Sequence, residues 1–364
     1  MAKPAKRPRA PRLTRGTAVT ALLLLAGCGG GTASLRSGGA SEDRPAPIRI
    51  VGSSTVYPFT TAVAEQFSLR FLKFPAPIVE STGTGGGIKL FCEAKGPNAP
   101  DMVNASRRMK PSEYALCRAN GVTEIIEVQV GLDGLALARS RRGPDFGLSE
   151  RDIYLALAAR PFGRPQTART WRDVNPALPD VRIEVIGPPP TSGTRDSFNE
   201  MFMEDGCLTE PAMKALKARD ERRFKEICTA IREDGRFVEG GENDNLIVMK
   251  LTQNPVAIGV FGFSYFDDHL DKLKAVKVNG VEPSFATIAD GRYPGARPLY
   301  IYARADRARM KPGIREFLAT YATEAVWGPG GLLEERGLTP APTPVRAAFA
   351  ARARGLVPMN PAEL

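Results

Sequence analysis

The sequence predicts an α/β fold in two lobes, with parallel-rich sheets and flanking helices. Four times along the chain, a short apolar, β-branched strand runs into a turn of Gly, Ser or Thr, and a helical pattern follows. Strands that alternate with helices in this way form largely parallel sheets. About 315 residues follow the N-terminal region, which is more than one hydrophobic core usually organises, so two lobes are expected.

The four units share the order of strand, polar turn and helix. Their strands and turns are predicted at residues 48–55, 77–87, 101–107 and 183–198. Helices are expected through Ala62 to Leu72, from near Ile88, from Pro111 and after the fourth turn.

The N-terminus has the order of a secretion signal. Basic residues up to Arg15 precede an apolar stretch from Ala18 to Ala26, which is too short to span a bilayer as a helix. The stretch closes on Leu-Ala-Gly-Cys28, which resembles a bacterial lipobox. This resemblance implies that residues 1–28 are a lipoprotein signal, with cleavage before Cys28, lipidation of its thiol and anchoring outside the cytoplasm. An uncleaved anchor or an ordinary signal peptide is the alternative.

The segment that follows the signal is predicted as a flexible tether. Residues 29–47 are rich in Gly, Ser and Pro and show no periodicity. Of the formal net charge of +10, six positive charges lie in the signal, which leaves about +4 on the remaining chain. So small a net positive charge does not indicate a nucleic-acid partner, and it is compatible with a small anionic ligand.

The cysteines predict two disulfides. Cys92, Cys117, Cys207 and Cys228 include no Cys-x-x-Cys pair, and His269 is the single histidine, so neither a metal site nor another cofactor is expected. In an oxidising compartment Cys92 pairs with Cys117 and Cys207 with Cys228. Each bond closes a loop of about 20 to 25 residues and stabilises by roughly 3 kcal/mol. Free buried thiols are the alternative.

The four polar turns share one chemistry. Each places Gly, Ser or Thr where a strand hands over to a helix, so that free backbone N–H groups and the positive end of the helix dipole point at one spot. Together they predict a site for an oxyanion held by many short hydrogen bonds. Taken singly, each turn is equally consistent with a helix N-cap.

Two of the turns end in an arginine, Arg107 in the third and Arg195 in the fourth. A guanidinium offers a fork of donors that matches two oxygens of a tetrahedral anion. We therefore expect both arginines to contact the ligand, whereas a surface ion pair with Asp196 is the alternative.

Enzymatic motifs do not fit. The glycine-rich stretch from Gly83 to Lys89 lacks the spacing of a P-loop, and no Gly-x-Ser-x-Gly sequence is present. His269 lies in a polar stretch without a nucleophile beside it. No catalytic residue is predicted, and the protein is expected not to be an enzyme.

Five motifs in order resemble the periplasmic phosphate-binding proteins of bacterial phosphate ABC transporters, the PstS-like family. These are Gly52-Ser-Ser-Thr-Val-Tyr-Pro58, Gly83-Thr-Gly-Gly-Gly-Ile88, Asn104-Ala-Ser-Arg107, Ser192-Gly-Thr-Arg-Asp-Ser-Phe198 and Tyr293-Pro-Gly-Ala-Arg-Pro-Leu-Tyr-Ile-Tyr302. The resemblance covers roughly residues 48–358.

The resemblance implies a type II solute-binding fold with two crossings between its lobes. Residues 48–130 and 260–345 would form lobe I, residues 131–259 lobe II, and residues 346–364 a C-terminal segment. The expected phosphate-binding residues, with Arg195 as the main cationic contact, are Ser54, Thr55, Thr84, Ser106, Arg107, Ser192, Gly193, Thr194 and Arg195.

The chain departs from the family at two points. Better-known members carry an aspartate where this chain has Ser106, and an arginine where it has Pro188-Pro189-Pro190. A carboxylate acceptor favours protonated phosphate over sulfate, since sulfate has no proton to donate.

The expected function is capture of inorganic phosphate and its delivery to an ABC permease with an ATPase. The protein would act in the periplasm as a monomer that meets the membrane only through its lipid. Binding of another tetrahedral oxyanion such as sulfate is the first alternative, and a phosphate-sensing or phosphatase-like protein is the second.

Overall fold

The structure is a computed structural model that describes residues 45–93, 95–96, 98–241 and 244–364. The predicted signal with Cys28, and most of the predicted tether, lie outside these residues. Residues 44–364 belong to one compact unit. Within the described part of the chain, no helix is long and apolar enough to span a bilayer.

The strands are β1 (Arg49–Gly52), β2 (Ile78–Ser81), β3 (Met102–Ala105), β4 (Ile125–Ser140), β5 (Val185–Gly187), β6 (Phe237–Glu239), β7 (Ile258–Gly262), β8 (Leu273–Ala275) and β9 (Ala296–Arg304). The first helices are α1 (Tyr57–Arg70), α2 (Thr84–Glu93), α3 (Pro111–Ala119), α4 (Glu150–Leu157), α5 (Trp171–Val174), α6 (Gly193–Phe198), the π-helical η2 (Asn199–Glu204), α7 (Asp205–Cys207), α8 (Pro211–Arg219) and α9 (Glu221–Cys228). The later helices are α10 (Asp244–Gln253), α11 (Phe263–Asp267), α12 (Phe285–Ala289), α13 (Ala305–Met310), α14 (Ile314–Tyr321), α15 (Glu324–Trp327) and α16 (Thr343–Gly355), and short 3₁₀ turns are η1 (Pro161–Gly163) and η3 (Pro361–Glu363).

The sheet has the strand order β2-β1-β3-β9-β4-β7-β5-β6, and β8 pairs with β4 beside this path. β1 runs parallel to β2 and β3, and β5 runs parallel to β6 and β7. Each of the four predicted units contributes its strand, and a helix follows each one. The predicted α/β fold is therefore confirmed.

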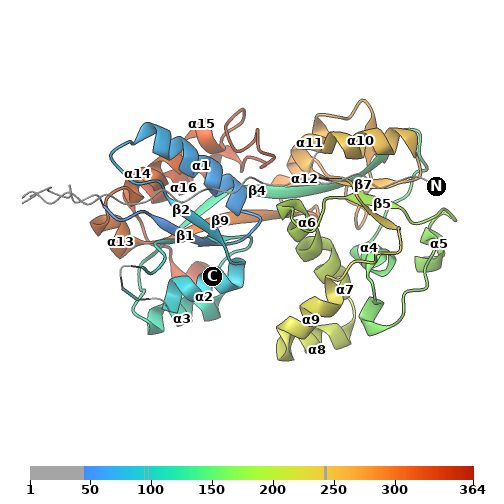
Figure 1. Cartoon of the computed structure of the whole chain (residues 1–364), viewed down its shortest axis with the longest axis horizontal. Helices are drawn as coiled ribbons and strands as arrows, with labels where there is room; N and C mark the ends of the chain where they lie inside the picture. Colours follow the sequence, from blue (N-terminus) through green and yellow to red (C-terminus); the bar gives the residue numbers. More distant parts are fainter. Residues whose placement is uncertain (1–44, 94, 97, 242–243) are drawn as a thin grey trace, which may run out of the picture. The chain divides into compact units, whose positions relative to one another are not determined.

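Two long strands, β4 and β9, connect the two parallel groups and lie side by side in the sheet (Figure 1). β4 pairs with β9 along residues 125–134 and with β7 and β8 along residues 135–140. The chain passes along β4 and returns along β9, which gives the two expected crossings. The pairs of β4 with β7, β8 and β9 are all antiparallel. The sequence of β4 does not show this, because a nearly continuous apolar run is more typical of a parallel strand.

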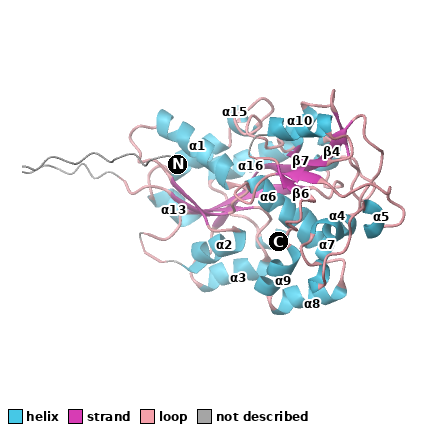
Figure 2. Ribbon diagram, turned by 45° about the vertical axis from the view of Figure 1, so that its right-hand side comes forward, coloured by secondary structure: helices cyan, strands magenta, loops and turns pink. Residues whose placement is uncertain are grey.

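Buried apolar side chains form distinct clusters along the sheet. One cluster, here called the central core, runs from Leu132 to Tyr293. Two others, together the first core, contain residues from 48–130 and 299–359. Ile50 packs in the cluster of α1 and α14, whereas Val51 packs in the cluster of α2 and α3. Helices therefore lie on both faces of the sheet (Figure 2).

One predicted boundary needs correction. Apolar residues between 260 and 293 pack in the central core and not with residues 48–130. The reason is that β7 pairs with β5 and with the far half of β4, so the helices that follow it stay on that side. The chain returns only with β9, at residue 296. The C-terminal segment packs into the first core through Ala353, Leu356 and Met359.

Both predicted disulfides are present. Cys92 of α2 is bonded to Cys117 of α3, and Cys207 of α7 is bonded to Cys228 of α9. The Cα atoms are 4.2 Å and 5.6 Å apart, and all four cysteines are buried. Each bond joins helices that pack on one core, as local loop closure requires.

Two glycines allow α2 to pack against the end of β1. Gly52 has a φ of +128°, and a Cβ there would collide with the carbonyl oxygen of Asn104. A Cβ at Gly87 would collide with the Cα of Gly52. The glycine-rich turn after β2 therefore has a packing function besides any role in binding.

Gly87→Ala is expected to lower the free energy of unfolding by about 1 to 3 kcal/mol, because the added methyl group meets backbone that cannot move aside. Gly85→Ala is the matched control in the same helix, since its Cβ would meet no atom within 4 Å. Denaturant unfolding of both variants measures the difference. Equal stability of the two would show that α2 tolerates a wider separation from β1.

Candidate functional site

The first three polar turns lie at one edge of the sheet. Each follows a strand of the group β2-β1-β3, and the carboxyl ends of neighbouring parallel strands meet at one edge. Ser54 and Thr55 follow β1, Thr84 opens α2, and Ser106 follows β3. Thr55, Thr84 and Ser106 are buried.

The fourth turn lies against the first. Ser192 caps α6 by accepting a hydrogen bond from the N–H of Thr194 at 3.2 Å. A Cβ on Gly193 would stand 3.4 Å from the carbonyl oxygen of Ser54. The hydroxyl groups of Ser197, in α6, and Thr55 are 3.3 Å apart. The structure thus brings turns from both cores together.

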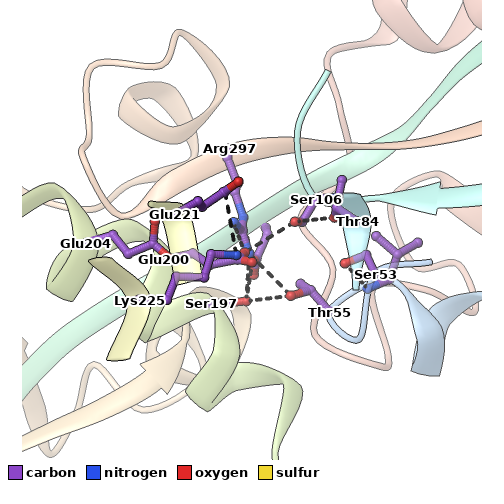
Figure 3. A network of polar contacts seen from close by, with 12 residues as sticks. Ser53, Thr55, Thr84, Ser106, Ser197, Glu200, Glu204, Glu221, Lys225 and Arg297 are labelled. Carbon is purple, nitrogen blue, oxygen red and sulfur yellow. Dashed lines mark hydrogen bonds and ion pairs between the residues drawn. The ribbon is translucent and has the colours of Figure 1, made fainter. Parts of the chain in front are cut away.

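A chain of hydroxyl groups ends on the carboxylate of Glu200 (Figure 3). The Ser106 hydroxyl donates to Glu200 Oε2 at 3.2 Å, and it lies 2.9 Å from the Thr84 hydroxyl. A hydroxyl group has one proton, so Thr84 donates to Ser106 in turn. Thr84 Oγ1 also accepts the backbone N–H of Ser106 at 3.1 Å.

Arg297 supplies the cation at this place. Its Nη1 pairs with Glu200, and its Nη2 donates to the hydroxyl groups of Thr55 and Ser197 at 3.3 Å each. Its Nε lies 3.4 Å from Asp133 Oδ2. Asp133 and Arg297 stand directly opposite each other in the β4–β9 register, so strand pairing positions the guanidinium.

Asp133 is the second carboxylate of the network. It accepts the Ser197 hydroxyl at 2.6 Å, and 13% of its side chain is exposed. Burial raises the pKa of Asp133, and the nearby Glu200 charge adds to the rise, whereas Arg297 and Ser197 oppose it. The site therefore contains one guanidinium between two carboxylates, with hydroxyl donors around it.

Arg195 lies apart from this network. Its side chain is buried, Nη1 donates to the Pro188 carbonyl at 2.9 Å, and the guanidinium lies 4.3 Å from the centre of the Phe237 ring. Burial lowers its pKa, and the charges of Glu239 and Asp196 oppose that effect. None of the ion pairs among the described residues includes Arg195. The surface ion pair with Asp196, which was the alternative to ligand contact, is therefore not formed.

Arg107 points to a different partner than expected. Its two terminal nitrogens bind both carboxylate oxygens of Glu113 at 2.9 and 2.7 Å. The hydrogen bonds with Glu113 raise the pKa of the guanidinium further above its ordinary value. A fork already filled by one carboxylate has little capacity for a second anion. Arg107 is thus a helix-anchoring residue of α3 in this structure.

Four residues of the network were missed by sequence reasoning, namely Asp133, Ser197, Glu200 and Arg297. Asp133 carried a signal, since a charged residue interrupts the apolar run of β4. Arg297 lies inside the fifth motif, and Ser197 inside the fourth. Nothing in the sequence around Glu200 indicated a role in the site, because Glu200 lies in the π-helical turn η2 that follows α6, and this turn is not predicted from the sequence.

This arrangement can bind an oxyanion. Ser106 and Arg297 already hold a carboxylate, and the hydroxyl groups of Thr55 and Thr84 stand beside it. His269 takes no part: its ring stacks on Tyr265, and Nδ1 bonds with the Tyr265 carbonyl oxygen.

Comparison with known proteins gives consistent matches. The family model of the PBP superfamily domain matches residues 31–324. Protein SphX of Synechococcus elongatus is 33% identical over 83% of this chain and 80% of its own length. The phosphate-binding protein PstS of Staphylococcus saprophyticus is 30% identical over 83% of this chain and 82% of its own length.

A solved structure agrees with these matches. The crystal structure of a possible phosphate binding protein from Planctomyces limnophilus superposes with a TM-score of 0.70 at 28% identity, covering 86% of this chain and 99% of that one. The resemblance of the five sequence motifs is therefore confirmed, and the chain belongs to the PstS-like phosphate-binding proteins of the PBP superfamily.

Proposed function

We propose that this protein is an extracytoplasmic binding protein that captures inorganic phosphate and delivers it to an ABC permease. One observation carries the proposal: the Ser106 hydroxyl and the Arg297 guanidinium converge on the carboxylate of Glu200, and the hydroxyl groups of Thr84 and Thr55 contact these two donors. A set of donors that stabilises this oxyanion fits the oxygens of a phosphate equally well. The family consists of binding proteins of transporters and not of enzymes.

The working motion is closure of two lobes over the ligand. Lobe I corresponds to the first core and lobe II to the central core, with the second boundary near residue 295. The crossings along β4 and β9 allow a hinge, and phosphate drives closure because it binds turns of both lobes at once. The protein acts as a monomer, and the lipid on Cys28 anchors it in the periplasm.

Glu200 also bears on the choice between phosphate and sulfate. The family aspartate is replaced by Ser106, but the Ser106 hydroxyl donates directly to Glu200. A carboxylate at this place accepts the proton of monohydrogen phosphate, whereas it repels the unprotonated oxygens of sulfate. This contact favours phosphate over sulfate, the other candidate ligand.

Calorimetric titration of protein freed of bound anion tests the function directly. Phosphate should bind tightly with one site per chain, and sulfate should give no comparable heat at the same pH. Tight sulfate binding would make the protein a sulfate carrier, and binding of neither anion would refute the proposal.

Glu200→Gln should narrow the preference for phosphate over sulfate by at least about tenfold, since an amide can donate to sulfate where the carboxylate cannot. Glu204→Gln is the matched control, because Glu204 lies in the same π-helical turn but pairs with Lys217 at 3.0 Å. Competition titrations of the two variants with phosphate and sulfate give the ratio of the two affinities. An unchanged ratio in Glu200→Gln would remove Glu200 from the selectivity of the site.

Arg195→Ala should weaken phosphate binding by about tenfold to a hundredfold, because charged hydrogen bonds in a closed cleft contribute roughly 1.5 to 3 kcal/mol. Among the described residues the buried Arg195 guanidinium has no carboxylate partner, and Arg195 follows the turn whose Gly193 lies against Ser54, so we expect it to be available for an anion held by the two turns. Arg107→Ala serves as the control and should leave affinity within about twofold, since Glu113 occupies its guanidinium. Parent-like affinity in Arg195→Ala would leave Arg297 as the cationic contact.

A further inference from the structure

The most exposed large apolar side chains of the described residues gather at one end of the first core. Leu72 is 87% exposed, Leu69 is 81% and Met310 is 75%, and the next large apolar residue, Val357, reaches only 50%. Leu69 lies in the last turn of α1, Leu72 directly follows that helix, and Met310 ends α13.

Aromatic packing holds these side chains in one neighbourhood. The Phe67 ring lies 5.0 Å from the Phe71 ring and stacks on the Phe74 ring at 5.8 Å. A Cβ on Gly313, three residues after Met310, would stand 3.3 Å from the Phe74 ring. The segment after α1 therefore touches the segment after α13. Leu69, Leu72 and Met310, together with the half-buried Phe71 and Phe74, are called the leucine face below.

Basic side chains border the leucine face. The Arg70 guanidinium lies 5.4 Å from the centre of the Phe71 ring, and the Lys73 ammonium lies 4.9 Å from that of Phe74. Neither takes part in an ion pair with any described carboxylate, whereas the neighbouring Lys311 pairs with Asp101. Two cations without a carboxylate partner next to exposed leucines suit an anionic lipid bilayer, which has acyl chains inside and negatively charged headgroups at its surface.

The face also adjoins the place where the described chain begins. Lys311 Nζ donates to the carbonyl oxygen of Pro47 at 2.7 Å. Cys28 precedes the first described residue by about 17 residues, and if the intervening segment is the tether that its composition predicts, its typical span is about 20 to 25 Å. A lipid on Cys28 would therefore keep the leucine face close to the bilayer.

We propose that the leucine face docks on an anionic lipid surface and orients the anchored protein. Leu69, Leu72 and Met310 enter the boundary between headgroups and acyl chains, while Arg70 and Lys73 meet lipid phosphates. Docking builds on the proposed anchor on Cys28, because tethering makes weak surface binding effective. Three protruding side chains are too few for a stable protein interface, which buries about 800 Å² on each partner.

Docking leaves the binding site free. α1 begins next to Thr55 and ends at Arg70 beside the leucine face, and its 14 residues span about 21 Å. The proposed phosphate site thus lies about one helix length away from the leucine face, so docking does not cover it.

The test uses full-length protein, processed and lipidated by a bacterial host, in vesicles of phosphatidylcholine and phosphatidylglycerol. A polarity-sensitive thiol probe is attached to Leu72→Cys or, as the matched control, to Leu246→Cys, another exposed leucine, in α10. Acyl-brominated lipids should quench the probe at residue 72 at least about twofold and leave the probe at residue 246 unchanged. Arg70→Gln with Lys73→Gln should weaken the quenching, as should vesicles without phosphatidylglycerol.

Each outcome decides a separate point. Protein that floats with vesicles but shows no quenching at residue 72 overturns docking while the anchor stands. Protein that does not float, with Cys28 reactive toward the probe, overturns both anchor and docking, and phosphate titration still tests the binding function independently. A probe at residue 72 that is shielded from aqueous iodide but not quenched by brominated lipid assigns the face to a second copy of the chain and also overturns docking.

Discussion

The antiparallel pairing of β4 with β9 joins the two halves of the sheet and positions the polar network. These strands connect the parallel group β2-β1-β3 with the group of β5, β6 and β7, so they carry the chain between the two cores. Their register also sets Asp133 opposite Arg297, at the level where the polar turns meet. A shift of either strand by one residue would turn its charged side chain to the other face of the sheet, so that Asp133 and Arg297 would no longer meet.

Two carboxylates balance the charge of Arg297. A buried guanidinium surrounded only by hydroxyl groups would be costly to desolvate. Asp133 and Glu200 neutralise it, and Glu200, with 37% of its side chain exposed, is the more exposed of the two partners. In the proposed function, phosphate takes over the Ser106 and Arg297 donors that hold Glu200 here, and the displaced Glu200 carboxylate beside it accepts the proton of the phosphate. The modest charge of the chain is consistent with such a site.

The two arginines named by sequence reasoning illustrate a general limit. Arg107 and Arg195 both follow polar turns, so local pattern treats them alike. In the folded chain a bidentate pair with Glu113 occupies Arg107, whereas Arg195 lies buried over Phe237 and pairs with no carboxylate of the described residues. The partners stand 6 and 42 residues away along the chain, and only packing reveals which side chain meets which.

The α/β class, the four strand–turn–helix units, both disulfides and the family follow from the amino-acid sequence alone, because each of these depends on local periodicity, short loops or motifs in order. The meeting of Thr55, Thr84 and Ser106 at one edge of the sheet could also be predicted, since polar turns at the ends of parallel strands converge by the geometry of the sheet. The partners of the cations, the assignment of residues 260–293 to the central core and the place of Glu200 become apparent only in the folded chain. Those features depend on strand register and on a π-helical turn, which bring together residues far apart in the sequence and leave no local pattern.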